Sequence, residues 1–126
     1  MTKLLLDTNV VIWLLLGDRD AVSSQVTELL LDEDNSISVS AVSTWEIAIK
    51  RSLGKLDIDA SWAKALTHLR FDQMPITAEH AAMVEHLPWH HRDPFDRLLV
   101  AQAILEDHVM VSADRQMKQY DIEVIW

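Results

Sequence analysis

Two aspartates lie between a basic loop and an apolar run in the stretch HHRDPFDRLLVAQA, residues 90–103. Asp93 precedes Pro94, a pair typical of a helix start, with Asp at the N-cap and Pro at the first helical position. Asp96 then falls at the third helical position, where it is either a second capping acid or a ligand-binding group. Because a carboxylate beside an apolar helix is costly unless it is paired, a bound cation would explain Asp96.

Two further acids follow apolar runs that resemble buried strands. Asp7 ends the run KLLLD, and Asp114 comes two residues after HVMVS. Ligands of parallel sheets bind outside the carboxyl ends of the strands, so both acids are expected at that edge. Each acid could instead cap the helix or turn that follows it. A functional role is favoured for Asp7, because Thr8 or Asn9 could supply that cap.

Glu46 lies in the segment STWEIAIK, which has the apolar spacing of a helix. Ser43-x-x-Glu46 fits a capping box, and Glu46 and Lys50 have the i,i+4 spacing of a helical ion pair. Ser40 offers a different cap one turn earlier, which would leave Glu46 available for another role. The sequence leaves both interpretations open.

Short apolar segments alternate with helical segments along the chain. Strands are predicted at residues 3–7, 36–40, 74–76, 108–112 and 122–126, and helices at 9–16, 21–32, 41–54, 60–69, 77–87 and 94–107. This alternation predicts βαβ units in a three-layer α/β/α fold with a central parallel sheet of four to five strands. The length indicates a single domain over residues 1–126.

The composition limits the kinds of site and partner. There is no cysteine, which excludes disulfides and thiolate zinc sites and fits a reducing cytoplasm. The apolar runs at the N-terminus are too short for a transmembrane helix, so a cytoplasmic protein with no membrane contact is expected. The net charge of −9 argues against a general nucleic-acid binder, because phosphate contacts need Lys and Arg.

Basic residues nevertheless gather near the candidate acids in the sequence. They form a candidate rim around a site, made of Lys50, Arg51, Lys55, Arg92, Arg97, Arg115 and Lys118. His90 and His91 are expected to be surface residues of the loop before Asp93. Trp13 and Trp45 have helical spacing with other apolar residues and are predicted core residues, whereas Trp89 is the tryptophan expected to contact a partner.

In these fragments the chain resembles PIN-domain ribonucleases, specifically the VapC-like toxins of bacterial toxin–antitoxin pairs. The resemblance spans nearly the whole chain and rests on the order and spacing of LLLDTNVVIWLL, SAVSTWEIAIKRSLGKL, HRDPFDRLLVAQA and MVSADRQM. It implies a PIN-like fold and a metal site made of Asp7, Glu46, Asp96 and Asp114. Asp96 matches better than Asp93, because the family's third acid lies two residues before a Leu-rich run.

The resemblance also implies a chemistry. Oxygen ligands without cysteine favour Mg²⁺ or Mn²⁺, and two such ions about 4 Å apart can activate water and stabilise the leaving oxygen of a phosphodiester. RNA hydrolysis, a cognate antitoxin protein and a homodimer are implied, with Thr8 or Ser112 orienting a ligand or a water. The candidate RNA contacts are Arg51, Arg92, Arg97 and Arg115. Without metal, mutual repulsion should raise the pKa of at least one of the four acids.

Two other classes of function stay open at this point. A phosphatase with an aspartyl nucleophile normally has a second acid two residues after the first, and position 9 here is Asn, which disfavours it. A non-catalytic binding module would use the same acids only to cap helices. Titration with Mn²⁺ separates the module from the nuclease, because the module would bind no metal at these acids.

Overall fold

The computed structural model describes all 126 residues, Met1–Trp126. Its strands are β1 (Lys3–Leu6), β2 (Ser36–Ser40), β3 (Asp72–Met74), β4 (Val109–Val111) and β5 (Val124–Ile125). Its α-helices are α1 (Thr8–Leu16), α2 (Ser24–Leu31), α3 (Ala41–Ser52), α4 (Trp62–His68), α5 (Ala78–Met83) and α6 (Pro94–Leu105). Short 3₁₀ helices span Arg19–Ala21, Val84–His86 and Arg115–Gln119. None of the helices has the length and apolar character needed to cross a membrane.

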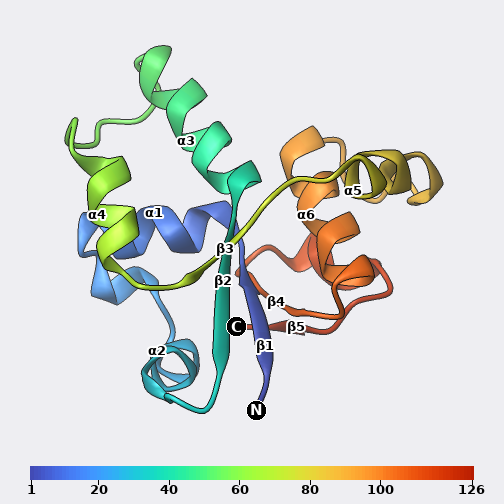
Figure 1. Cartoon of the computed structure of the whole chain (residues 1–126), viewed down its shortest axis with the longest axis horizontal. Helices are drawn as coiled ribbons and strands as arrows, with labels where there is room; N and C mark the ends of the chain where they lie inside the picture. The colour runs from blue at the N-terminus through green and yellow to red at the C-terminus, as the bar shows by residue number, and fades with distance from the viewer.

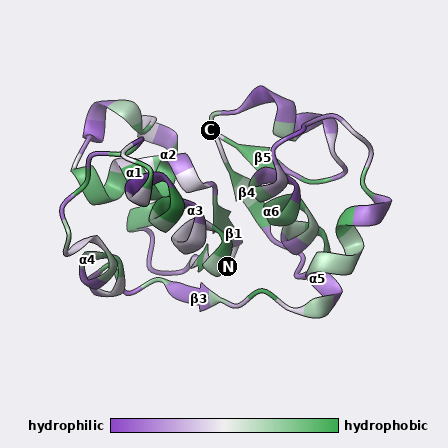
Figure 2. Ribbon diagram, turned by 90° about the horizontal axis from the view of Figure 1, so that it is seen from above, coloured by the Kyte–Doolittle hydropathy of each residue, from purple (hydrophilic) through white to green (hydrophobic).

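The five strands form one sheet in the order β3-β2-β1-β4-β5, and every neighbouring pair is parallel. Helices α1 to α4 lie on one side of this sheet, and α5 and α6 lie on the other (Figures 1 and 2). The predicted three-layer α/β/α fold with a central parallel sheet is therefore confirmed. Because β1 is central, its carboxyl end lies between those of β2 and β4, where the candidate acids are expected.

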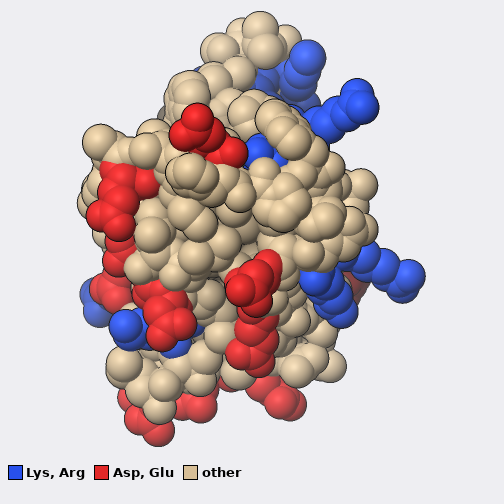
Figure 3. Space-filling model, turned by 90° about the vertical axis from the view of Figure 1, so that its right-hand side faces the viewer, with Lys and Arg blue, Asp and Glu red and all other residues tan.

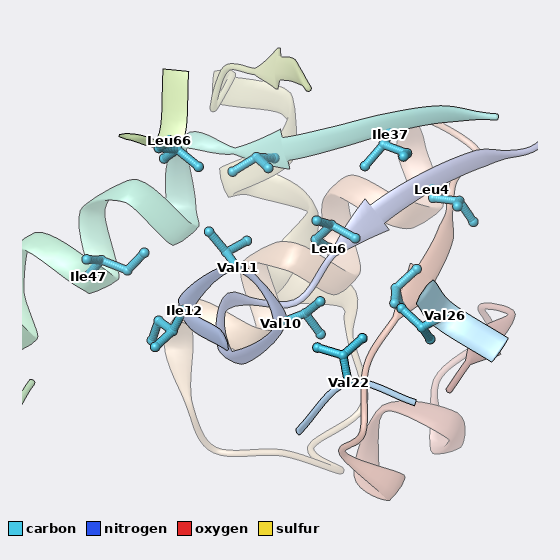
Figure 4. Close-up of a cluster of buried hydrophobic side chains, with 12 residues drawn as sticks. Leu4, Leu6, Val10, Val11, Ile12, Val22, Val26, Ile37, Ile47 and Leu66 are labelled. Atoms are coloured by element: carbon cyan, nitrogen blue, oxygen red, sulfur yellow. The ribbon is translucent and has the colours of Figure 1, made fainter. Parts of the chain in front are cut away.

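The core explains why the first strand is apolar at every position after Lys3. Leu4, Leu5 and Leu6 are fully buried, because helices cover both faces of the sheet. Side chains alternate along a strand, so Leu4 and Leu6 pack on the side of α1 with residues such as Val10 (Figure 4). Leu5 packs on the opposite side, in the cluster that includes Leu99 of α6. The central strand is thereby held firmly from both sides.

Some predicted boundaries were wrong. The strand predicted at residues 74–76 is β3, Asp72–Met74, and it ends before Pro75, which has no N–H for a ladder hydrogen bond. The helix predicted at 21–32 begins only at Ser24, because Ser23 is its N-cap and accepts the N–H of Val26. The helix predicted at 77–87 is α5, followed by a separate 3₁₀ turn. None of these shifts moves a candidate acid.

Candidate active site

Asp7 lies directly after the central strand. Its N–H continues the ladder to the carbonyl oxygen of Val111 at 2.9 Å, and its Oδ1 accepts the N–H of Thr8 at 2.7 Å as the N-cap of α1. Its Oδ2 accepts a hydrogen bond from Ser112 Oγ at 2.6 Å. Burial raises the pKa of Asp7, although the hydrogen bonds from Ser112 and Thr8 oppose this rise. The capping alternative is therefore present, and Asp7 rather than Thr8 or Asn9 supplies the cap. The charges of Glu46 and Asp114 also raise the pKa of Asp7.

The start of α3 decides between the two interpretations of Glu46. Ser40 is the N-cap, and its Oγ accepts the N–H of Val42 at 3.0 Å. Ser43 lies inside the helix and shares a 3.0 Å hydrogen bond with Thr8 Oγ1, so the capping box with Glu46 does not form. Glu46 is therefore not used to begin the helix.

The two oxygens of the Glu46 carboxylate differ in their surroundings. Oε2 lies 3.0 Å from Lys50 Nζ, which confirms the predicted ion pair. Oε1 is buried and has no hydrogen-bond partner. A buried polar atom without a partner costs about 1–3 kcal/mol, so it needs an explanation. A cation bound at Oε1 would supply one.

Helix α6 begins as the sequence predicted. Asp93 is its N-cap, and Oδ1 accepts the N–H groups of Phe95 at 2.8 Å and Asp96 at 3.2 Å, with Pro94 at the first helical position. The capping role fully explains Asp93. It also fixes the first turn from which Asp96 extends, with a side chain that is 17% exposed.

Asp114 follows β4 and is joined to the central strand through Ser112. Its N–H donates to Ser112 Oγ at 3.0 Å, and its Oδ1 accepts the N–H of Gln116 at 2.9 Å as the cap of the 3₁₀ helix Arg115–Gln119. The predicted capping alternative for Asp114 is therefore also present. Its Oδ2 is not used by the cap and lies 3.0 Å from His91 Nε2.

His91 is the residue of this site that the sequence analysis missed. Its Nε2 lies 3.0 Å from Oδ2 of both Asp96 and Asp114, and the possible ligand atoms of these three residues lie within 4.8 Å of one another. Its side chain is only 15% exposed, so its expected surface position was wrong, whereas His90 is exposed. The one signal in the sequence was its position two residues before Asp93, from which its ring can accept the N–H of that capping residue.

Electrostatic repulsion connects all the candidate acids. The pKa of Asp96 is raised to about 8, first by burial and then by the charges of Asp7, Asp93, Glu46 and Asp114. The expectation that one of the acids has a raised pKa is therefore confirmed. Asp7 and Glu46 lie outside the closest group, which holds His91, Asp96 and Asp114. Asp96 therefore lies in the closest group and is also affected by the charges of the acids outside it.

The expectation for Arg97 was wrong. Arg97 is 2% exposed, and its guanidinium donates to the carbonyl oxygens of Pro88 at 2.9 Å, Val84 at 3.1 Å and Leu87 at 3.3 Å. It also lies over the ring of Trp89, 3.7 Å from the ring centroid. Arg97 therefore holds the loop before α6 together and is not accessible to RNA, because the carbonyl groups of this loop need a buried donor.

The remaining basic candidates are on the surface. Arg51, Arg92 and Arg115 are exposed. In the view of Figure 3, basic side chains lie in separate groups near the edge of the face, with acidic side chains between them. This face therefore carries no continuous basic surface.

The structure corrects the prediction for Trp45 and agrees with the predicted surface position of Trp89. Trp45 is 52% exposed, because Ile47 and Val42 and not Trp45 form the buried side of α3. One edge of its ring packs against Phe95, with the ring centroids 4.9 Å apart. Trp89 is 76% exposed, in agreement with its predicted place in a surface loop.

The donor set of the cluster fits a divalent metal ion. Asp7, Glu46, Asp96 and Asp114 offer carboxylate oxygens, which Mg²⁺ and Mn²⁺ favour. The partnerless Oε1 of Glu46 and the repulsion on Asp96 are both features that a cation would relieve. These residues could therefore hold a divalent cation at the carboxyl edge of the sheet.

Solved structures with a similar fold include chains of bacterial toxin–antitoxin complexes. A chain of VapBC2 from Rickettsia felis bound to a DNA fragment from its promoter has a TM-score of 0.75 and 16% identity, covering 99% of each chain. A chain of VapBC-1 from nontypeable Haemophilus influenzae has a TM-score of 0.70 and 16% identity, covering 98% of this chain and 97% of that one. A chain of FitAcB from Neisseria gonorrhoeae has a TM-score of 0.60 and 17% identity, covering 98% and 96%.

Sequence comparison identifies the family. The comparison with curated proteins found no significant match. The PIN domain family, however, matches residues 4–123, a range that contains all four candidate acids, strands β2 to β4 and all of β1 except Lys3, and that ends just before β5. The match covers far more than half of the chain, and the fold agrees with it. The chain belongs to the PIN domain family.

Proposed function

We propose that this protein is a metal-dependent endoribonuclease that acts as the toxin of a toxin–antitoxin pair. PIN domains are generally nucleases, and the chain is a member of that family. The observation that carries the proposal is the state of Asp96. Burial of its carboxyl and then the charges of Asp7, Asp93, Glu46 and Asp114 raise its pKa to about 8. A bound cation would stabilise the ionised form that repulsion disfavours.

Asp7, Glu46, Asp96 and Asp114 would hold the metal, which we propose to be Mg²⁺ or Mn²⁺, with two ions in the site. Divalent ions at such a site supply Lewis acidity toward the phosphodiester and lower the pKa of water. The chain itself orients the ligands. The hydroxyl of Ser112 fixes Oδ2 of Asp7, and Asp93 fixes the helical turn that carries Asp96.

Recognition of RNA has to be local, because two divalent ions would reduce the net charge only from −9 to −5. The exposed side chains of Arg51, Arg92 and Arg115 are the proposed phosphate contacts. A few isolated cations give weak general affinity for nucleic acid. Such a protein suits a structured RNA with an unpaired loop, where base edges and not backbone charge give the selectivity.

We also propose that a cognate antitoxin protein and a second copy of this chain bind it, in the cytoplasm and without a membrane. The named VapBC and FitAcB structures support an antitoxin partner. An apolar pocket of about 420 Å³ offers a candidate surface for one of these protein contacts. The hydrophobic residues that line it are Trp13, Leu14, Val22, Leu30, Leu31 and Leu69.

The test maps new RNA 5′ ends in cells that express the wild type, Asp96→Asn or Asp121→Asn. Asp121 is exposed, so its variant is the matched control. The wild type and the control should produce the same new 5′-phosphate ends, and Asp96→Asn should produce none. Calorimetric titration with Mn²⁺ should show binding to the wild type and much weaker binding to Asp96→Asn. Unchanged cleavage by Asp96→Asn, or a wild type that binds no Mn²⁺, would instead favour a non-catalytic module.

A further inference from the structure

His91 is fixed at several points in the loop before α6. Its N–H donates to Tyr120 Oη at 2.9 Å, and its carbonyl oxygen accepts a long hydrogen bond of 3.5 Å from Arg97 Nη1. Its ring Nδ1 accepts the N–H of Asp93 at 3.1 Å. The backbone and one ring nitrogen are therefore both held, which leaves Nε2 facing Asp96 and Asp114 in a defined orientation.

The hydrogen bond from Asp93 determines which ring nitrogen carries the proton. A backbone N–H can only donate, so Nδ1 of His91 must present its lone pair. In a neutral imidazole the proton is then on Nε2. That N–H lies 3.0 Å from Oδ2 of Asp96 and 3.0 Å from Oδ2 of Asp114. His91 therefore donates to both carboxylates.

We propose that His91 is a positioning residue, which sets the separation of Asp96 and Asp114 for a divalent cation without binding the cation itself. The inference rests on the proposed function, because it takes these two carboxylates to be metal ligands. A carboxylate oxygen has two lone pairs, so an oxygen that accepts the Nε2–H can still bind a cation. When both are ionised, as metal binding requires, the two carboxylates would repel each other and separate without a donor between them.

The alternative, in which His91 is a nitrogen ligand, conflicts with the same hydrogen bond. A ligating Nε2 needs its lone pair, which moves the proton to Nδ1. The Nδ1–H and the N–H of Asp93 would then face each other as two donors, and the 3.1 Å contact between them would be lost. The cluster of His91, Asp96 and Asp114 has the spacing of a three-ligand site, but the proton positions make His91 a donor.

Two substitutions separate the two hydrogen bonds of the ring. In His91→Asn the amide oxygen can still accept the N–H of Asp93, but the side chain is too short to reach the carboxylates. In His91→Gln the longer side chain can place an amide N–H near the position of Nε2. His86→Gln is the matched control, because the side chain of His86 is 72% exposed.

The experiment measures the affinity of the full chain for Mg²⁺ and for Mn²⁺ by calorimetry. His91→Asn should weaken the binding of both metals by the same factor, about 10-fold or more, as is usual when a hydrogen-bond partner of a metal ligand is lost. His91→Gln should restore most of that loss, and His86→Gln should change nothing. In ¹⁵N NMR spectra, the proton of His91 should stay on Nε2 both without metal and with Mg²⁺ bound.

Several results would overturn the inference. A loss confined to Mn²⁺, or an Nε2 without its proton in the Mg²⁺-bound protein, would make His91 a nitrogen ligand. Unchanged or tighter binding in His91→Asn would remove its positioning role. If His91→Asn does not fold, the NMR spectra of the wild type decide the question. A wild type that binds neither metal would overturn the proposed function as well. A wild type that binds metal no more tightly than His91→Asn would overturn only the role of His91.

Discussion

Ser112 Oγ donates to Asp7 Oδ2 across 2.6 Å and so joins the ends of two neighbouring strands whose residues are 105 positions apart. The same hydroxyl oxygen accepts the N–H of Asp114 at 3.0 Å. Ser112 is fully buried, so water cannot replace either hydrogen bond. One side chain therefore connects two of the proposed metal ligands, and its removal should affect both.

Ser112→Ala should lower the free energy of unfolding by about 1–3 kcal/mol, because it leaves the buried Oδ2 of Asp7 without its donor and the N–H of Asp114 without its acceptor. The hydrogen bond from Ser112 lowers the pKa of Asp7, so its loss should raise that pKa further and weaken Mn²⁺ binding, more strongly at lower pH. Urea denaturation and Mn²⁺ titration measure the two effects. Ser24→Ala, at an exposed helix position, should leave both unchanged. Equal Mn²⁺ affinity in the two variants would show that the hydrogen bonds of Ser112 to Asp7 and Asp114 do not contribute to metal binding.

Asp96→Asn should stabilise the metal-free protein at neutral pH. The pKa of Asp96 is raised from 3.8 to about 8, so between these values the folded state holds more protons than the unfolded state. Stability contributed by the protonated group is therefore lost as the pH rises through this window. Asn imitates the protonated carboxyl, and it should raise the free energy of unfolding by about 1–3 kcal/mol at pH 8.

The pH profile supplies the control for Asp96→Asn. Well below pH 3.8 Asp96 is protonated in both states, so the difference from the wild type should vanish. Thermal melts in the presence of a chelator, over a pH range that extends from well below 3.8 to above 8, measure this dependence. A variant that is less stable than the wild type at pH 8 would mean that Asp96 serves the fold and not a ligand.

The ion pair between Glu46 and Lys50 should stabilise the metal-free protein only modestly. Lys50→Met removes the only partner of Glu46 Oε2, and Oε1 already has none. The side chain of Lys50 is 39% exposed, so solvent screens the pair and the expected cost is about 1 kcal/mol. The double variant with Glu46→Gln should recover that cost, because it removes the unpaired charge. A double-mutant cycle measured by urea denaturation tests this coupling, and strictly additive effects would exclude it.

The elements that the sequence predicted well are those with local signals. Asp93 followed by Pro94 placed the start of α6 correctly, because a cap and its helix are neighbours in the chain. The apolar run in β1 was placed correctly, because a central parallel strand is buried on both faces. The parallel sheet likewise followed from the alternation of strands and helices, whereas the order of its strands was not predicted. Asp7, Asp96 and Asp114 were singled out for the same reason, since they lie beside the ends of such elements, whereas Glu46 lies inside α3.

The misses depend on contacts between distant segments. His91 contacts Asp114, which is 23 positions away, and no local pattern indicates that contact. Arg97 has the sequence context of an exposed helical cation, yet it is buried because the loop before α6 turns its carbonyl groups toward it. Trp45 has helical spacing, but Ile47 faces the core instead. In each case tertiary structure and not local propensity determines the exposure of the side chain.

Arg97→Lys should disturb the loop that carries His91, although it keeps the charge. The guanidinium of Arg97 binds three carbonyl groups within 3.3 Å and stacks on Trp89, and one ammonium group cannot reproduce a planar donor with that spread. The free energy of unfolding should fall by about 2–4 kcal/mol, because carbonyl groups that had a buried partner lose it.

The effect of Arg97→Lys should extend to the metal site through His91. Loosening of the loop should speed amide hydrogen exchange at residues 88–92 and weaken Mn²⁺ binding in the same direction as His91→Asn, even though Arg97 binds no metal. Arg92→Lys, a neighbouring exposed position, is the matched control and should change neither. If Arg97→Lys lowers stability but leaves both the exchange of the loop and the Mn²⁺ affinity at wild-type values, the position of His91 does not depend on Arg97. The support for Asp96 and Asp114 would then come from Tyr120 and Asp93 alone.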